Sequence, residues 1–329
     1  MRPSRYNFSV VGDGDRVALF NSSTGTLLNV AGPDGAALAS ALEDPARSFS
    51  SDEFHGEVLG HLRDGGFLVD DAVDELQVIR DRYWHARGAT PVVLTVATTM
   101  DCNLGCYYCY EKRSADKISV TNIPELVSLA ERLVEGSRQG SLHVDWYGGE
   151  PLLNLAFLEQ ASEALQASCR RTGSRYVASI ISNGTEWPAD IESFVQRHRI
   201  AQVQISFDGL KENHDKRRRY RKGYSIPGTS SFERATALID RLVTCVRVDL
   251  RFNIDRRNQR DLLPFIDFAR QRGWFNAPLP AVFQPARLAA YSDASAFMRS
   301  YALTLPEFDA LRDQVRRWSC PYQTGHAAG

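Results

Sequence analysis

The sequence predicts an α/β protein in which a small mixed module precedes a larger domain built on a parallel sheet. Three observations predict this class: short strands separated by turns near the N-terminus, a regular alternation of strand-like and helix-like segments after residue 90, and an ordinary globular composition. The 329 residues are 43% hydrophobic and 24% charged, which is enough apolar material for a well-formed core. This length allows one large domain and one small domain.

The first part of the chain predicts a compact α+β module. Its β-like runs alternate with Asp-Gly and Thr-Gly turns, which are typical of hairpins. The predicted elements are strands over 7–11, 16–20 and 26–30, helices over 34–42 and 52–64, a short strand over 66–69 and a helix over 73–85. This layout predicts a small winged-helix-like domain over residues 1–88, with Gly88-Ala89-Thr90-Pro91 as the linker.

From residue 91 onward the pattern changes to repeated strand–helix units. Strand-like apolar runs are expected at 92–97, 142–147, 176–181, 202–207, 246–254 and 280–283. Helix-like stretches separate them at 124–135, 155–171, 188–198, 231–245 and 259–272. Repeated units of this kind imply a parallel sheet with helices outside it. Active residues are then expected on loops at the carboxyl ends of the strands.

Charge and composition exclude several classes of protein. The net charge is −1, so no global field favours nucleic acid or a membrane. Residues 1–85 hold seven arginines, no lysine and fourteen acidic residues, which argues against phosphate binding by the N-terminal module. No apolar run is long enough to span a bilayer, and the N-terminus lacks a signal core. We therefore expect a soluble, cytoplasmic protein.

The most informative motif places Cys102, Cys106 and Cys109 in the spacing C-x3-C-x2-C. Three thiolates on one loop can hold three irons of a cubane iron–sulfur cluster, whereas full ligation by protein takes four. The remaining iron is then open to an outside ligand, which makes a metal centre reactive. Zinc would usually need a second cysteine pair or a His-x3-His, and neither follows. A disulfide framework is not expected either, because such frameworks are typical of small secreted chains and this chain has 329 residues.

Polar motifs follow the next two strands. Gly148 and Gly149 allow close approach of the backbone to a ligand, and the carboxylate of Glu150 can pair with a cation. A plain strand-to-helix connection is the simpler reading of this turn. Ser182 and Asn183 follow the third strand, where hydroxyl and amide groups suit hydrogen bonds to a ligand's oxygen atoms; an ordinary Asn-Gly turn is the alternative.

The fourth and fifth strands carry further candidates. Ser206 and Asp208 end the fourth, and the charge run 214–222 that follows is most simply a solvated face. On the fifth, polar residues alternate with apolar ones at Asp249, Arg251, Asn253 and Asp255. A period of two puts all four on the same side of the strand. Polar groups facing a barrel interior favour pocket lining, while an outward, solvated face is the alternative.

Together these motifs resemble those of the radical S-adenosylmethionine (SAM) superfamily, with Tyr108 in the aromatic position before the third cysteine. The resemblance implies a partial (β/α)6 TIM-like barrel over residues 89–300. It also implies a [4Fe–4S] cluster on the three cysteines, with SAM chelating the open iron. The residues that it places at SAM are Tyr108, Gly148, Gly149, Glu150, Ser182, Asn183, Ser206 and Arg251. In this reading Asp208 either caps a turn or binds a ribose hydroxyl.

The resemblance extends to the loop after the fourth strand and to the C-terminal end. In relatives an arginine of that loop lies near the active site, so one of Arg217, Arg218 and Arg219 is expected to reach the SAM carboxylate or the substrate. The segment before Cys320 resembles the start of the SPASM extension, which carries auxiliary clusters, so residues 301–329 read as a shortened extension. One cysteine cannot hold a cluster alone. Either the chain is truncated relative to its relatives or it works without auxiliary clusters.

The first hypothesis is a radical SAM oxidoreductase that modifies a ribosomally made peptide. The N-terminal module would bind the leader of this precursor by accepting it as a strand on a sheet edge, or would serve only as a lid or cap. A flavodoxin or ferredoxin would supply electrons. The alternatives are a sulfatase-type protein maturase and a non-catalytic iron–sulfur sensor. The SAM motifs argue against a sensor, which has no use for a SAM pocket.

Overall fold

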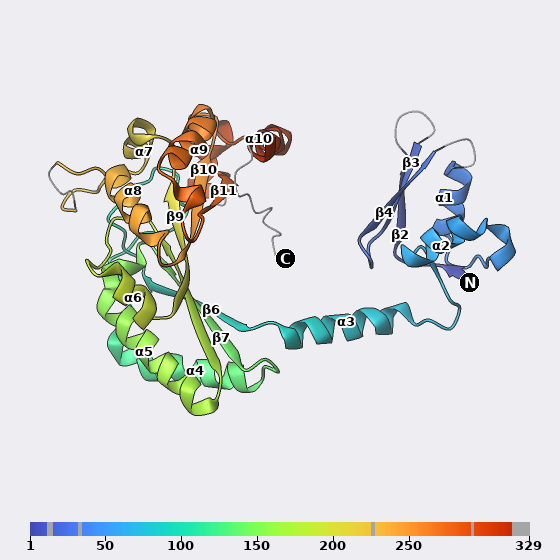
Figure 1. Ribbon diagram of the computed structural model, residues 1–329, viewed down its shortest axis with the longest axis horizontal. Helices are drawn as coiled ribbons and strands as arrows, with labels where there is room; N and C mark the ends of the chain where they lie inside the picture. Colours follow the sequence, from blue (N-terminus) through green and yellow to red (C-terminus); the bar gives the residue numbers. More distant parts are fainter. Residues whose placement is uncertain (12–15, 32–34, 225–227, 291–292, 318–329) are drawn as a thin grey trace. The chain divides into compact units, whose positions relative to one another are not determined.

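The computed structural model describes residues 1–11, 16–31, 35–224, 228–290 and 293–317 (Figure 1). The chain divides into two compact units, Met1–Thr90 and Pro91–Gly329. The turn predicted over 12–15 and Cys320 lie outside the described residues.

The first unit contains a three-stranded antiparallel sheet with helices packed on one face. The strands are β2 (Asn7–Val11), β3 (Arg16–Asn21) and β4 (Thr26–Ala31), in that spatial order. Helix α1 (Gly35–Glu43) contacts all three strands, and α2 (Gly56–Asp64) adds Leu62 to the core. A two-stranded antiparallel ladder joins β1 (Arg2–Pro3) to β5 (Leu68–Val69).

Helix α3 (Glu75–Ala89) corrects the predicted linker. Gly88 and Ala89 were expected to lie in it, but both are helical. The helix begins at Asp74, whose side chain accepts a hydrogen bond from the Gln77 amide at 3.0 Å. It ends before Thr90 because a residue that precedes proline disfavours the helical conformation. The boundary between the two units falls between Thr90 and Pro91.

The second unit is the predicted parallel sheet with helices packed on its outer face (Figure 1), and the α/β fold class is confirmed. The six strands are β6 (Val92–Thr99), β7 (Ser141–Gly148), β8 (Arg175–Ser182), β9 (Ile200–Phe207), β10 (Arg247–Ile254) and β11 (Val282–Arg287). They follow one another spatially in chain order, and every pair is parallel. The last strand lies later than the predicted 280–283. Its Pro285 is tolerated because β11 is an edge strand.

The connecting helices agree with the predicted strand–helix alternation, with one addition. They are α4 (Ile123–Glu135), α5 (Leu155–Thr172), α6 (Ile191–Arg197), α8 (Ser231–Leu242) and α9 (Leu262–Gln271), and α10 (Leu305–Arg317) follows the last strand. The unexpected helix is α7 (Lys211–Arg217), which contains part of the charge run. None of the helices in the described part of the chain is long and apolar enough to cross a bilayer.

Alternation along the strands separates an apolar face from a polar one. Trp146, Ile180 and Phe252 are fully buried in the main core, where they meet the helices. Their neighbours Tyr147 and Arg251 line a cavity on the opposite face. Because strand side chains alternate with a period of two, one apolar set builds the core while the other set remains available for a site.

Candidate functional site

One cavity of about 250 Å³ lies at the carboxyl ends of the strands. It gathers ten of the eleven residues that the sequence assigns to the cluster and SAM. These are Cys102, Cys106, Tyr108, Cys109, Gly148, Gly149, Ser182, Asn183, Ser206 and Arg251. The carboxyl ends of parallel strands meet at one edge of the sheet, so motifs that are far apart in the chain converge there.

The loop that carries the cysteines is held by Asp101. Its carboxylate accepts hydrogen bonds from Arg221 Nη1 at 2.7 Å, from the Tyr224 hydroxyl at 2.5 Å and from the Cys102 amide at 2.9 Å. Burial opposes ionisation, but the Tyr224 and Arg221 hydrogen bonds hold the pKa of Asp101 below its usual range. Asp101 is therefore charged at neutral pH and fixes the start of the loop.

The Cys102 sulfur already has hydrogen-bond donors. The Leu104 amide lies 3.5 Å and Asn183 Nδ2 lies 3.8 Å from Sγ. Burial, reinforced by the charge of Glu150, raises the pKa of Cys102 to about 12. Burial also raises the pKa of Cys106, although the positive charge of Arg218 opposes this shift. These thiols would be protonated without metal and would ionise when cationic iron binds.

Three cysteines that face one cavity, with donors aimed at a sulfur, fit a cluster that leaves one iron to an outside ligand. The donor set therefore suits a multi-iron group better than mononuclear zinc, which takes four tetrahedral ligands.

Gly148 and Gly149 let the end of β7 cross the start of the cysteine loop. The Gly149 amide donates to the Thr99 carbonyl at 2.9 Å, and the Glu150 amide donates to the Asp101 carbonyl at 2.8 Å. Gly148 has φ +135°, and a Cβ there would overlap the Thr99 carbonyl oxygen. A Cβ on Gly149 would overlap the carbonyl oxygen of Asp101. Only glycine fits at both positions.

Gly148→Ala is expected to destabilise the protein by about 2–4 kcal/mol, since it adds backbone strain to a steric clash. Gly173→Ala is the matched control, because Gly173 also has positive φ but a Cβ added there would meet no atom within 4 Å. It should cost only about 1 kcal/mol. Urea unfolding of both variants measures the difference. Equal costs would show that contact with the cysteine loop does not restrict position 148.

Among the residues assigned to the cluster and SAM, Glu150 is the one that does not line the cavity, and of the polar residues predicted on β10 only Arg251 and Asn253 line it. Its side chain is fully buried. The carboxylate accepts hydrogen bonds from Ser182 Oγ at 2.9 Å, from the Asn183 amide at 2.7 Å and from the Leu152 amide at 3.3 Å. It thus ties the end of β7 to the end of β8. A contact between Glu150 and the SAM amino group remains a prediction.

The buried carboxyl of Glu150 gives a pH-dependent stability. Burial, opposed by hydrogen bonds from Asn183 and Ser182, raises its pKa from 4.5 to about 7. Between these values the folded protein retains a proton that the unfolded chain has lost, so stability falls as pH rises. In the cluster-free protein this proton lowers the free energy of unfolding by up to about 1.4 kcal/mol for each pH unit of increase. We expect Glu150→Gln to remove this pH dependence.

Urea titrations at several pH values between 4.5 and 7 measure this slope. Glu125→Gln, at an exposed position of α4, is the control and should keep the wild-type slope. If the Glu150→Gln slope equals that of the wild type, Glu150 titrates in the folded state as it does in the unfolded chain.

The charge run is not the solvated face that was expected. Arg217 and Arg218 are each only 7% exposed. Arg217 donates to Asp208 and Asp255, each at 3.0 Å, and to the Tyr107 hydroxyl at 2.7 Å. The run is therefore partly a buried ion network, and it is placed by α7.

Arg218 is the arginine of the run that reaches the cavity. Its Nη1 donates to the Tyr108 hydroxyl at 2.8 Å, and its buried Nε has no hydrogen-bond partner. It lines the cavity, whereas Arg219 is exposed. The Asp208 carboxylate receives hydrogen bonds from Tyr108, Arg217 and Arg218. In this structure Asp208 thus anchors the ion network, and a contact between Asp208 and a ribose hydroxyl remains a prediction.

Several cavity residues were missed from the sequence, among them Glu111, Tyr147, Gln204 and Arg287. The Tyr147 and Tyr110 hydroxyl oxygens lie 2.5 Å apart. Burial, together with a hydrogen bond to Glu111, raises the pKa of Tyr147. Oε2 of Glu111 is buried without a partner. The period-two pattern that was recognised on β10 also runs along β7 and β9, and there it would have indicated Tyr147 and Gln204.

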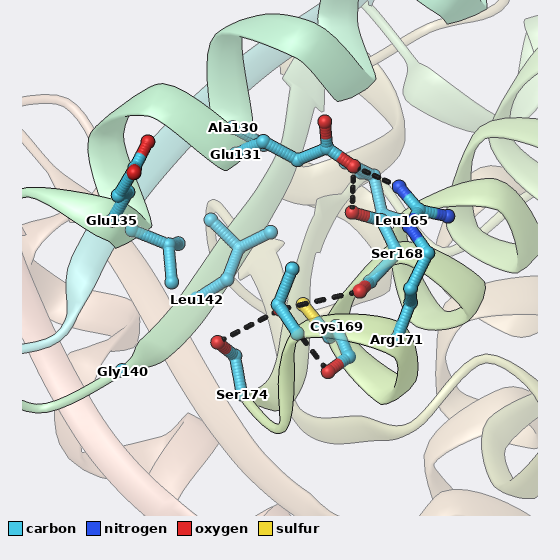
Figure 2. Close-up of a pocket in the computed structure, with 12 residues that line it drawn as sticks. Ala130, Glu131, Glu135, Gly140, Leu142, Leu165, Ser168, Cys169, Arg171 and Ser174 are labelled. Atoms are coloured by element: carbon cyan, nitrogen blue, oxygen red, sulfur yellow. Dashed lines mark hydrogen bonds and ion pairs between the residues drawn. The ribbon is translucent and has the colours of Figure 1, made fainter.

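A larger cavity, of about 490 Å³, lies at the amino ends of β7 and β8, between α4 and α5 (Figure 2). The Glu131 carboxylate on its wall pairs with Ser168 at 2.6 Å and with Arg171 (Figure 2). Cys169 also lines it, with a pKa raised by burial. Because catalytic groups of parallel barrels lie at the carboxyl ends of strands, the smaller cavity is the candidate active site.

Comparison with known protein families supports this choice. A family model described as the radical SAM superfamily matches residues 96–269. A Fe-coproporphyrin III synthase from Methanosarcina barkeri is 27% identical over 177 residues, or 53% of this chain and 39% of that protein. The mycofactocin maturase MftC of Mycobacterium tuberculosis is 26% identical over 189 residues, or 56% of this chain and 43% of that protein. The chain spans about two fifths of the length of these relatives.

Solved structures share the fold at low sequence identity. The structure of anSMEcpe with bound AdoMet and the Cp18Cys peptide has a TM-score of 0.54 and 19% identity, covering 70% of this chain and 60% of that one. Streptococcus suis SuiB bound to the precursor peptide SuiA has a TM-score of 0.51 and 13% identity, covering 98% of this chain and 72% of that one.

Proposed function

The chain belongs to the radical SAM superfamily, and we propose that it is an enzyme that cleaves SAM at a [4Fe–4S] cluster to modify a ribosomally made peptide. The observation that carries this proposal is a single cavity lined by Cys102, Cys106 and Cys109 at the carboxyl edge of a parallel sheet. When bound, the cluster and SAM would supply one-electron chemistry and a 5′-deoxyadenosyl radical that abstracts hydrogen from the substrate. The residues of the cavity would bind and orient SAM and the substrate, and they would exclude water from the reaction.

The cavity offers each part of SAM a complementary group. The backbone of Gly148 and Gly149 is open to close approach, which suits the amino acid end of SAM. Ser182, Asn183 and Ser206 present hydroxyl and amide groups for its oxygen atoms. Arg218 has a buried, unpartnered Nε and is the best candidate to pair with the carboxylate of SAM.

The network around Asp208 would keep this cation in place. Burial opposes the charge, but Tyr108, Cys106 and Asp208 together raise the pKa of Arg218 well above its ordinary value. Arg218 therefore remains a guanidinium cation when the cavity is closed to water. Asn253 Nδ2 also donates to the Tyr108 hydroxyl, at 3.3 Å, so β10 helps to position this tyrosine.

A peptide substrate is supported by the first unit. In the described residues β2 and β4 each have one side without a strand partner, and an extended leader peptide can add to such an edge through backbone hydrogen bonds. SuiB, whose fold likeness covers 98% of this chain, was solved with a precursor peptide. A flavodoxin or ferredoxin in the cytoplasm completes the proposal as the source of electrons.

The test is anaerobic reconstitution with iron and sulfide, followed by dithionite, SAM and chromatography for 5′-deoxyadenosine. Product formation that depends on Cys102, Cys106 and Cys109 is the expected result. A cluster that forms but neither binds nor cleaves SAM would favour the iron–sulfur sensor. If no cluster assembles, the proposal is overturned. Candidate precursor peptides and proteins, added to the active system, then separate a peptide maturase from a sulfatase-type protein maturase.

A further inference from the structure

Beyond the end of α7, the charge run contains two exposed cations that the proposed active site does not use. Arg219 and Lys222 are exposed, and neither lines the cavity among the residues that the structure describes. Arg221, between them, is committed to Asp101 at 2.7 Å. Lys112 and Arg113, just after the third cysteine, are exposed as well. We call Lys112, Arg113, Arg219 and Lys222 the basic patch.

Both halves of the basic patch are attached to the loop that carries the cysteines. The Gly105 amide donates to the Arg219 carbonyl at 2.8 Å, and Leu104 forms an antiparallel bridge with Tyr220. On the other side, Arg113 Nη1 donates to the Leu104 carbonyl at 3.3 Å. The backbone of Arg219 and the side chain of Arg113 therefore lie against the stretch between Cys102 and Cys106. Cys109, the last ligand candidate, is itself exposed.

The patch is a local exception in a chain of net charge −1. The sequence has no Asp or Glu in 112–115 or in 219–224, so no acid within these segments neutralises the exposed cations. Charge that is concentrated on one face steers an oppositely charged partner and sets its orientation. The partner is therefore acidic at its contact surface.

We propose that the basic patch is the docking surface for an acidic one-electron carrier protein. This inference rests on the proposed function, because it assumes that the cysteines hold a reducible cluster. The reduced carrier would lose one electron, the cluster would gain it, and no atom would change hands. Electron transfer requires the donor to dock near the acceptor, and the backbone hydrogen bonds between residues 103–105 and 219–221 place this surface directly against the cysteine loop.

A peptide substrate fits the patch less well. The reacting part of a peptide must enter the cavity. Of the four patch cations only Arg113 lines it in the described structure, while Lys112, Arg219 and Lys222 do not. Carrier complexes, by contrast, are small, transient and strongly electrostatic. The patch also lies beside the loop that carries the cysteines, where an electron would enter the cluster.

The test compares Arg219→Glu/Lys222→Glu with the control Arg138→Glu/Arg175→Glu. The control reverses two exposed cations at the amino ends of β7 and β8, so both variants change the net charge equally. The probes are a purified acidic flavodoxin and a purified acidic [2Fe–2S] ferredoxin. Calorimetry on the reconstituted protein gives their dissociation constants at low salt. Initial rates of 5′-deoxyadenosine formation are measured with reduced carrier and, separately, with dithionite.

The patch variant is expected to bind at least one carrier about tenfold more weakly, a loss of about 1.4 kcal/mol, and to lose carrier-driven rate by a similar factor. Its dithionite-driven rate should match the wild type, and the control should match in every assay. Salt should weaken wild-type binding more than binding by the variant.

The proposal is overturned if the wild type and the patch variant bind both carriers equally. It is also overturned if the patch variant loses affinity only for an acidic peptide. Absence of dithionite-driven product in the wild type would instead contradict the proposed function, while the binding measurement would still decide the docking surface.

Discussion

Replacing Cys102, Cys106 or Cys109 singly by alanine is expected to abolish cluster assembly and all SAM cleavage. Each cysteine lines the same cavity, and three thiolates are the minimum that leaves a cubane cluster with a single open iron. With only two thiolates, a second iron would lose its protein ligand and become exposed to water.

Iron and sulfide content, the visible absorption of the reconstituted protein and 5′-deoxyadenosine formation measure this loss. Cys245→Ala is the matched control, because Cys245 is half-buried just beyond the end of α8 and lies outside the cavity lining. It should retain full iron content and activity. An alanine variant at Cys102, Cys106 or Cys109 that still cleaves SAM would remove that cysteine from the ligand set.

Replacing Arg217 by methionine is expected to cost about 3–5 kcal/mol of stability, the usual effect of breaking a buried ion pair. The guanidinium bridges Asp208 and Asp255, both of which are fully buried. Methionine would leave two carboxylates close together without this cation, and Tyr107 would lose its donor at 2.7 Å. The carboxylates would then take up protons or water, and both responses loosen the loop that carries the cysteines.

Urea unfolding of the cluster-free protein, followed by tryptophan fluorescence, measures this effect, because Trp146 and Trp274 are fully buried in the second unit. Lys216→Met is the control on the same helix. Lys216 makes only an exposed pair with Glu212 at 2.8 Å, and its loss should cost less than about 1 kcal/mol. Similar unfolding midpoints for the two variants would show that the Arg217 network contributes little.

Much of the architecture was predictable because it follows from local patterns. Strand and helix periodicity located the six parallel strands, since alternation of apolar residues is dictated by which face each element buries. The carboxyl-edge rule then predicted that the cysteine loop, Gly148-Gly149 and Ser182-Asn183 would converge. Spacing alone indicated Cys102, Cys106 and Cys109 as a ligand set, because cluster geometry restricts how far apart thiolates on one loop can be.

Other features required the tertiary structure. The charge run looked solvated because neighbouring residues cannot show that Arg217 and Arg218 meet Tyr107, Tyr108 and Asp208 from other loops. Gly88 and Ala89 looked like a linker because glycine weakens helices, yet the helix continues to the residue before Thr90-Pro91.

Glu150 marks the boundary between the two kinds of information. The sequence by itself determined that a carboxylate follows two glycines at the end of a strand. Only the folded chain decided that this carboxylate is buried against Ser182 and the Asn183 amide rather than open to the cavity. Periodicity records which face of an element is buried. The partners of a buried charge are set by long-range packing, because a carboxylate removed from water must find its donors wherever the fold brings them.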